Sequence, residues 1–87
     1  MFPIAMSTPP EARKTRTLDL RAIIAAGDEP FTMIMTAVAA VGLGDTLVLV
    51  TPFLPSPLIE RLQGEGFSAR PERRSDGSWR TAFTRDS

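Results

Sequence analysis

The stretch GDEPFTMIMTAVAAVGLGDTLVLVT, residues 27–51, contains the pattern that decides the fold. Its first part predicts a helix from Pro30 to about Val41, because a proline fits the first position of a helix. Gly42 and Gly44 follow directly and end this helix. Apolar residues recur at helical spacing within it and predict a buried stripe. The stripe consists of Phe31, Ile34, Met35, Val38 and Val41.

The second part of the stretch, residues 45–51, is a continuous apolar run rich in valine, and it predicts a central strand. Upstream, residues 15–21 alternate polar residues with Leu18 and Leu20, which predicts a short strand with one apolar face. We expect residues 22–27 to be a connection that packs against the domain. The predicted helix then joins two parallel strands as a crossover.

Downstream, residues 51–57 form a linker that three prolines make stiff. Ser56 as the N-cap and Pro57 at the first helical position predict a second, shorter helix. Gly64 and Gly66 end it. Its apolar face consists of Leu58, Ile59 and Leu62.

The end of the chain predicts a β-hairpin whose register depends on the length of its loop. A two-residue loop would place its apolar residues on the same face as arginines. A three-residue loop, residues 75–77 with Gly77 left-handed in a bulge, gathers the apolar residues of both strands on one face. We expect the three-residue loop, because a shift of one residue moves every side chain to the other face. The predicted pairs are Phe83 with Ala69, Thr81 with Pro71, and Glu72 with Arg80.

The predicted order is strand, helix, strand, helix, strand, strand. It indicates an α+β fold, a two-layer α/β sandwich with two helices on one face of a sheet. Residues 15–87 form a single domain in this interpretation. Residues 1–14, rich in proline and without an apolar period, are expected to be a flexible tail, in which Met6 is an alternative start. The uncovered face of the sheet could serve association into a homodimer.

The composition excludes several kinds of chemistry. The 87 residues include no cysteine, histidine or tyrosine, so disulfides, thiol nucleophiles and histidine acid–base catalysis are absent from the chain. No apolar run approaches the roughly 20 residues of a membrane helix. We therefore expect a cytoplasmic protein that is not an enzyme and that has neither a catalytic residue, nor a cofactor, nor a metal site.

The basic residues are unevenly distributed. None lies between residues 22 and 60, whereas six of the ten follow from Arg61 onward. A set of arginines on the predicted hairpin suggests an alternative function for the chain, the binding of anions or nucleic acid. Solvated surface charge explains the same pattern. Zero net charge and a pI near 6.2 disfavour nucleic acid. The alternative set consists of Arg70, Arg73, Arg74 and Arg80.

Several short segments carry a family resemblance in their order and spacing. They are Leu18-Asp19-Leu20-Arg21, Glu29-Pro30 before a helix, Gly44-Asp45-Thr46-Leu47 before a strand, Pro55-Ser56-Pro57-Leu58, Gly66-Phe67 and Trp79. The chain thereby resembles the TusA/SirA-like superfamily. It is closest to the uncharacterised TusA-related domain-of-unknown-function family 2249. The resemblance covers about residues 16–85 and implies a mixed four-stranded sheet in the order 1-2-4-3, with the fourth strand antiparallel.

The resemblance also implies what this chain lacks. The sulfur carriers use a Cys-Pro-x-Pro motif at the start of their first helix, and the thiolate carries a persulfide. Here the corresponding residues are Gly27-Asp28-Glu29-Pro30, so Gly27 stands at the nucleophile position and only the second proline is kept. A persulfide relay through this chain alone is therefore excluded. Leu54 stands where many relatives have an acidic residue or histidine.

These observations predict a non-catalytic binding or accessory module that acts through an unidentified protein partner. The resemblance implies a redox or nitrogen/sulfur-metabolism context. Two plainer roles stay open: Asp28 and Glu29 as helix caps, and Arg21 as a partner of Asp19. The expected partner-binding surface consists of Arg21, Asp28, Glu29, Phe53, Pro55 and Pro57.

Overall fold

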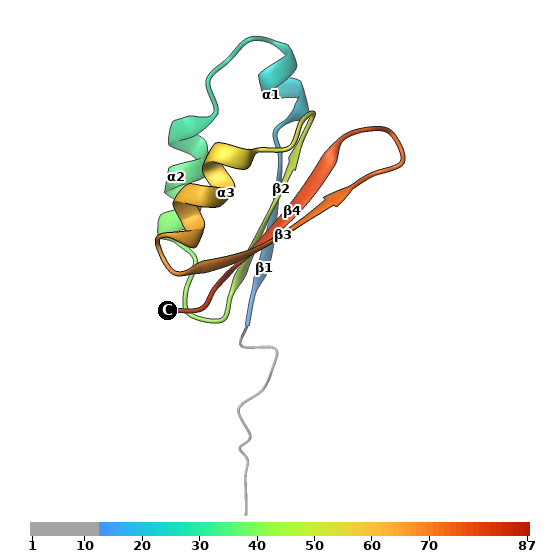
Figure 1. The fold of residues 1–87 in the computed structure, drawn as a ribbon. Coiled ribbons are helices and arrows are strands. Elements are labelled where there is room, and N and C mark those ends of the chain that lie inside the picture. The colour runs from blue at the N-terminus through green and yellow to red at the C-terminus, as the bar shows by residue number, and fades with distance from the viewer. Residues whose placement is uncertain (1–12) are drawn as a thin grey trace, which may run out of the picture.

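The computed structural model describes residues 13–87. Most of the predicted N-terminal tail, with Met6, lies outside these residues. Four strands form one mixed sheet in the order β1-β2-β4-β3 (Figure 1). β1 and β2 are parallel, and β4 is antiparallel to both β2 and β3, as the family resemblance implies. The strands are β1 (Thr15–Asp19), β2 (Thr46–Thr51), β3 (Phe67–Arg73) and β4 (Trp79–Arg85).

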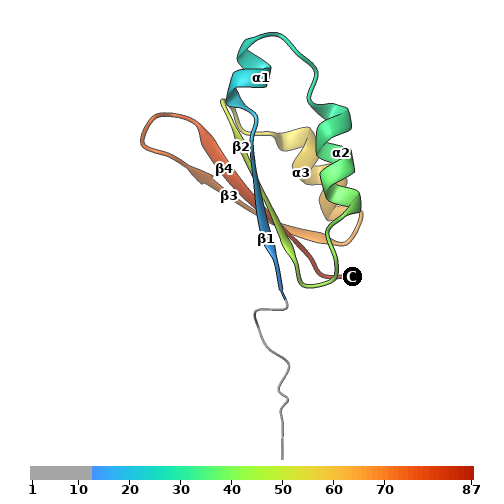
Figure 2. The same cartoon turned by 180° about the vertical axis from the view of Figure 1, so that it is seen from behind.

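Two helices, α2 (Phe31–Ala39) and α3 (Ser56–Gln63), cover one face of the sheet, as Figures 1 and 2 show from opposite sides. The predicted two-layer α+β sandwich and its element order are confirmed, apart from one additional short helix. Within the described part of the chain, every helix is too short to cross a bilayer.

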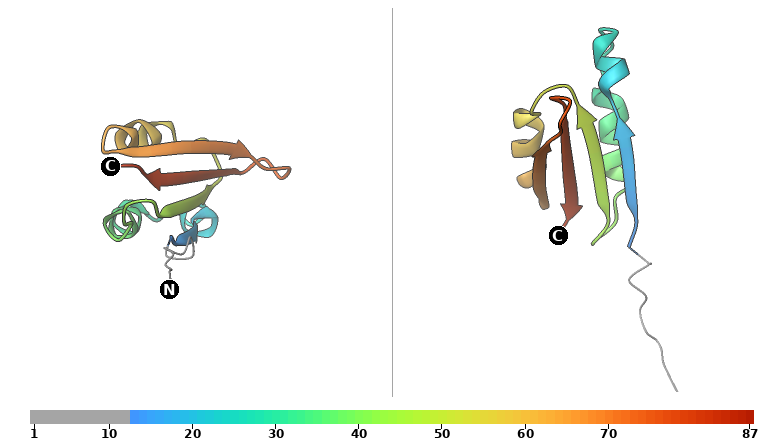
Figure 3. Two further views of the ribbon diagram at one scale, coloured as in Figure 1. Left: turned by 90° about the horizontal axis from the view of Figure 1, so that it is seen from below. Right: turned by 90° about the vertical axis from the view of Figure 1, so that its right-hand side faces the viewer.

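The additional helix, α1 (Arg21–Ala25), takes the place of the connection predicted for residues 22–27. It continues beyond the end of β1 (Figure 3). The amide of Ile24 donates to the carbonyl of Leu20, and that of Ala26 donates to Ala22, both at 3.0 Å. Gly27 ends the helix at φ +82°, a left-handed conformation that glycine adopts without steric cost. The helix has no side-chain cap, so the sequence lacked a signal for it.

The hydrophobic core lies between the sheet and the helices, and α2 buries three residues in it. The predicted stripe is correct for Ile34, Val38 and Val41, and Met35 is partly buried against the core. Phe31, in contrast, is 45% exposed. As the first residue of α2, Phe31 lies at the edge of the stripe, where the guanidinium of Arg61 is 5.3 Å from its ring. The largest fully buried side chains are Phe83, Leu20, Leu47, Leu49, Leu62, Val48 and Thr81.

The starts of both α2 and α3 differ from the prediction by one residue. Pro30, predicted as the first helical residue, is the N-cap of α2, whose first helical residue is Phe31. The amide of Ile59 donates to the carbonyl of Pro55 at 3.0 Å, so Pro55 is the N-cap and Ser56 the first helical residue. No side chain caps this end. The predicted capping by Ser56 is therefore wrong, while the proline beside it fits the first turn as expected.

The predicted hairpin register is confirmed. Ala69 pairs with Phe83, Pro71 with Thr81, and Glu72 with Arg80. The loop comprises residues 75–77, because the amide of Arg74 donates to the carbonyl of Ser78 at 2.8 Å. Gly77 has φ +88°. Burial of Phe83 fixes the register, since a one-residue shift would expose it.

The sheet face away from α2 and α3 is largely polar. Thr46 and Thr84 lie side by side on it, with their hydroxyl oxygens 2.9 Å apart. Val48 is buried on this face without belonging to the main core, because the register places Thr17 and Ala82 beside it. None of the large exposed hydrophobic side chains among residues 13–87 lies on a strand. Association into a homodimer stays a prediction, and this face offers it little apolar area.

Candidate functional site

The connection between α1 and α2 contains two of the predicted partner-binding residues. The carboxylate oxygen Oε1 of Glu29 accepts the amide hydrogen of Phe31 at 2.5 Å, so Glu29 caps the start of α2. The amide of Asp28 donates to the carbonyl of Ile23 at 3.1 Å, which fixes the backbone of the connection. Within residues 13–87 the carboxylate of Asp28 accepts no hydrogen bond and is exposed. Of the two adjacent carboxylates, Glu29 has a structural role and Asp28 is free to meet a partner.

The loop between β2 and α3 contains the other predicted residues. Its backbone is held from within, because the Thr51 hydroxyl donates to the carbonyl of Phe53 at 2.6 Å. Phe53 is 54% exposed and Leu54 is 39% exposed. Pro55 is buried and Pro57 is exposed. Phe53 and Pro57 can therefore touch a partner directly, while Pro55 can only support the loop.

The connections that lead into α2 and α3 lie at the same end of the molecule, the upper end in Figures 1 and 2. We give the name loop-end surface to six exposed side chains of these connections and of the first turns of α2 and α3. Phe31 belongs to it, although the sequence predicted that residue to be buried. The loop-end surface consists of Asp28, Glu29, Phe31, Phe53, Leu54 and Pro57.

Arg21 has a different role from the rest of the predicted set. Its guanidinium lies 2.6 Å from Oδ2 of Asp19 and 3.1 Å from Oδ2 of Asp76. The hydrogen bonds that Arg21 donates lower the pKa of Asp19 to about 2. The pKa of Asp76 is also lowered, first by hydrogen bonds from Ser78 and then by the charges of Arg74 and Arg21. The predicted pairing of Arg21 with Asp19 is confirmed, and Arg21 joins the end of β1 to the hairpin loop.

The four hairpin arginines do not form one cluster. Arg70 and Arg80 line a shallow hollow of about 260 Å³ on the open face of the sheet, and Glu72, which lies opposite Arg80, lines it too. Arg73 pairs with Trp79 and therefore points to the opposite face. The backbone amide of Arg74 closes the hairpin loop. A single anion cannot contact all four.

A hollow of about 190 Å³ that the sequence did not predict lies between β1 and the C-terminal half of α2. Lys14 and Arg16 line it from the strand side. The alternation that placed Leu18 and Leu20 on one face also puts Lys14 and Arg16 on that face, so the signal was present in the sequence. Residues 13–87 contain no group of three or more acidic side chains arranged to hold a metal ion.

Comparisons with known proteins identify the family of the chain. The model of a family described as uncharacterized conserved protein (DUF2249) matches residues 17–85, which span the whole sheet except for the first two residues of β1. No curated protein and no solved structure matches. The matched segment includes the loop-end surface and the hairpin. The chain therefore belongs to the DUF2249 family of uncharacterized conserved proteins.

Proposed function

We propose that this domain is a non-catalytic binding or accessory module that holds a protein partner at the loop-end surface. One observation carries the proposal. Of the five large hydrophobic residues exposed within residues 13–87, three belong to this surface: Phe31, Phe53 and Leu54. Exposed apolar side chains gathered at one end of a small domain are typical of an interaction site.

The charge of the loop-end surface narrows the kind of partner. Asp28 and Glu29 lie on it, and no basic residue occurs between residues 22 and 60. The Arg61 side chain over the Phe31 ring also pairs with Glu65, at 3.2 Å. We expect a partner surface with apolar side chains and positive charge, because complementary charges favour encounter and fix orientation.

The proposal includes descent from the TusA/SirA-like carriers with loss of their chemistry. The strand order supports this relationship. Gly27, at the position of the carrier cysteine, has φ +82°, a conformation that residues with a side chain rarely adopt. The backbone itself is thus unsuited to a cysteine at this position. A supporting role in a redox or nitrogen/sulfur-metabolism system fits a domain that keeps the fold without the thiol.

The test is a pull-down from native lysate with the immobilised full chain, compared with the double variant Phe53→Ser/Leu54→Ser. We expect partners held by the wild type to be lost from this variant. Leu43→Ser is the matched control, because Leu43 is 71% exposed and lies outside the loop-end surface. Retention of every partner by the double variant, or equal loss from the control, would show that another surface is used.

The arrangement of the arginines argues against the nucleic-acid alternative. Arg70 and Arg73 point to opposite faces of the sheet, and the acidic Glu72 lies directly opposite Arg80. Single-stranded nucleic acid needs a continuous basic groove with aromatic stacking, and none of the strand residues that face the open side of the sheet is aromatic. A gel shift with RNA and DNA at several salt concentrations tests this directly. Tight binding that weakens steeply with salt would contradict our preference.

A further inference from the structure

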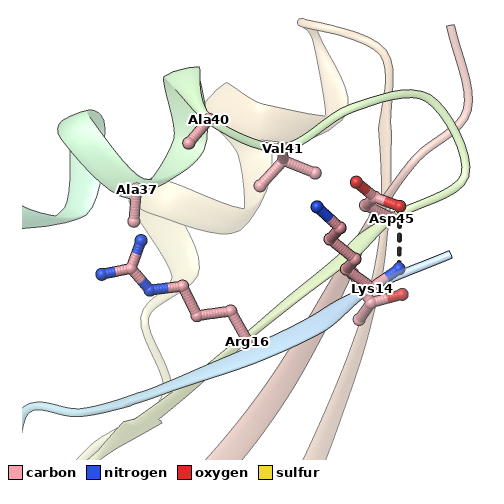
Figure 4. Close-up of a pocket in the computed structure, with 7 residues that line it drawn as sticks. Lys14, Arg16, Ala37, Ala40, Val41 and Asp45 are labelled. Carbon is pink, nitrogen blue, oxygen red and sulfur yellow. Dashed lines mark hydrogen bonds between the residues drawn. The ribbon is translucent and has the colours of Figure 1, made fainter. Parts of the chain in front are cut away.

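The hollow between β1 and α2 has two unlike walls. Figure 4 shows Arg16 and Lys14 extending from β1 beneath the C-terminal half of α2. The helix side consists of small apolar side chains, and the volume between the walls is about 190 Å³. The hollow lies toward the other end of α2 from the loop-end surface, so the two are separate. The residues that carry the argument are Lys14, Arg16, Ala37, Ala40, Val41 and Asp45.

The hollow follows from the sequence of the two elements that enclose it. β1 is an edge strand, so no further strand from residues 13–87 covers its outer side. α2 presents Ala37 and Ala40 to it, and these small side chains fill little of the space between helix and strand. The strand presents Lys14 and Arg16, whose long side chains keep their charged ends in water. The space is therefore left open and has a positive rim.

Neither cation is neutralised within residues 13–87. Lys14 and Arg16 form no ion pair there, and neither side chain donates a hydrogen bond. Asp45 is the acidic residue of the hollow, but its oxygens accept backbone amides, from Lys14 at 2.9 Å and from Gly42 at 3.3 Å. Figure 4 shows the Asp45 carboxylate at the far end from the Arg16 guanidinium. The end of the hollow beside Arg16 is thus free for an anion.

The negative end of the α2 dipole is a competing reason for cations at this place. Two carbonyls of its last turn already have partners, because Ala37 and Val38 accept the amides of Ala40 and Val41, each at 3.1 Å. The carbonyl of Val41 accepts Nη1 of Arg85, also at 3.1 Å. Arg85 is therefore the cation that hydrogen-bonds the backbone just beyond this end of α2, and within residues 13–87 neither Lys14 nor Arg16 donates a side-chain hydrogen bond to it.

We propose that this hollow binds a small aliphatic carboxylate. A guanidinium binds a carboxylate through two parallel hydrogen bonds, and Lys14 adds a second positive charge nearby. The apolar wall of Ala37, Ala40 and Val41 fits a short alkyl chain. The volume is below the roughly 300–1,000 Å³ typical of sites for larger ligands, so the ligand has only a few carbon atoms. Butanoate is a suitable probe.

The test is an amide NMR titration of the full chain with sodium butanoate at constant ionic strength. We expect saturable shifts at Arg16, Ala37, Ala40 and Val41. Butanamide, which has the same shape without the charge, should give none. Inorganic phosphate should bind more weakly, because it makes no use of the apolar wall. Binding of phosphate as tight as that of butanoate, or shifts that never saturate, would overturn the proposal.

Two variants separate the charge of the hollow from its shape. Arg16→Gln should weaken butanoate binding by about tenfold, the loss expected for one charge-assisted hydrogen bond at an accessible site. Ala40→Leu adds no charge but places a larger side chain at the helix wall, and it should weaken binding as well. Arg70→Gln, on the opposite face of the sheet, is the control and should bind like the wild type. If Ala40→Leu binds normally, or Arg70→Gln loses as much as Arg16→Gln, the ligand lies elsewhere.

Discussion

Arg21 and Asp76 form an ion pair of 3.1 Å although 55 residues separate them in the chain. Arg21 also binds Asp19, so one guanidinium connects the end of β1 to the loop of the hairpin. All three side chains are partly exposed, and such contacts depend on salt and pH.

Arg21→Gln should raise the pKa of Asp19 from about 2 toward its ordinary value of 3.8. A lowered carboxylate pKa stabilises the fold above pH 3.8, and this contribution is lost as the pH falls through about 2. Wild type should therefore be the more stable protein at pH 7, and the difference should disappear below about pH 2. Carboxyl NMR titration and thermal melts measure both effects. Arg61→Gln serves as the control, and an unchanged Asp19 pKa in Arg21→Gln would contradict the assignment.

Gly77→Val should destabilise the protein by about 1–2 kcal/mol, because Gly77 has φ +88° and a β-branched residue is strained there. Urea unfolding gives the free energy. Gly64→Ala is the control, since Gly64 has φ −70° and an alanine fits that conformation. Equal stability of Gly77→Val and wild type would count against the three-residue loop.

Thr81→Val should stabilise the protein by about 1 kcal/mol. Thr81 is fully buried, and its hydroxyl oxygen has no hydrogen-bond partner within residues 13–87. A buried hydroxyl without a partner costs about 1–3 kcal/mol, and valine has a similar shape. Thr84→Val is the matched variant, and it should not stabilise, because Thr84 shares a hydrogen bond with Thr46. Loss of stability in Thr81→Val, measured by urea unfolding, would indicate that the hydroxyl is satisfied in solution.

Glu29→Ala should cost about 0.5–1 kcal/mol, because the Glu29 carboxylate caps the amide of Phe31. Asp28→Ala changes the neighbouring carboxylate without removing a hydrogen bond to residues 13–87, and its stability should stay within about 0.5 kcal/mol of wild type. Thermal unfolding of the two variants under one set of conditions makes the comparison. A larger loss of stability in Asp28→Ala than in Glu29→Ala would show that the cap has been assigned to the wrong residue.

Much of the fold could be predicted because several local signals agree with one another. The hairpin register followed from alternation together with one glycine, and Gly77 indeed has a positive φ. The helix α1 could not be predicted, since it has five residues and no capping side chain. Phe31 was misplaced for another reason. Helical spacing gives the direction of a side chain, but not whether a neighbouring element covers the first turn.

The candidate site was less predictable than the fold. The contact between Arg21 and Asp19 is local and could be expected, whereas the contact with Asp76 depends on where the sheet brings the hairpin. The hollow beside Arg16 could not be predicted, because it depends on the distance between β1 and α2, and residue spacing in the sequence does not determine that distance. That the hairpin arginines lie on two faces of the sheet could have been predicted from the register, because alternate residues of a strand point to opposite faces.

The two edges of the sheet differ in whether another chain can extend them. The backbone carbonyl of Lys14 and the backbone amide of Leu20 bond to β2. The backbone groups of the alternate residues Thr15, Thr17 and Asp19 therefore point away from β2, toward the open edge of the sheet. At the other edge, the backbone amide of Arg74, just after β3, bonds to the carbonyl of Ser78. By alternation the backbone of Pro71 points away from β4, toward the open edge, and proline has no amide hydrogen to donate there. Within residues 13–87, the edge of the sheet along β1 is therefore open to strand addition, whereas Pro71 blocks it at the centre of β3. Two copies joined through β1 would leave only the two β3 edges, where Pro71 opposes the addition of a further strand, so such pairing would stop at a dimer rather than grow into a fibre.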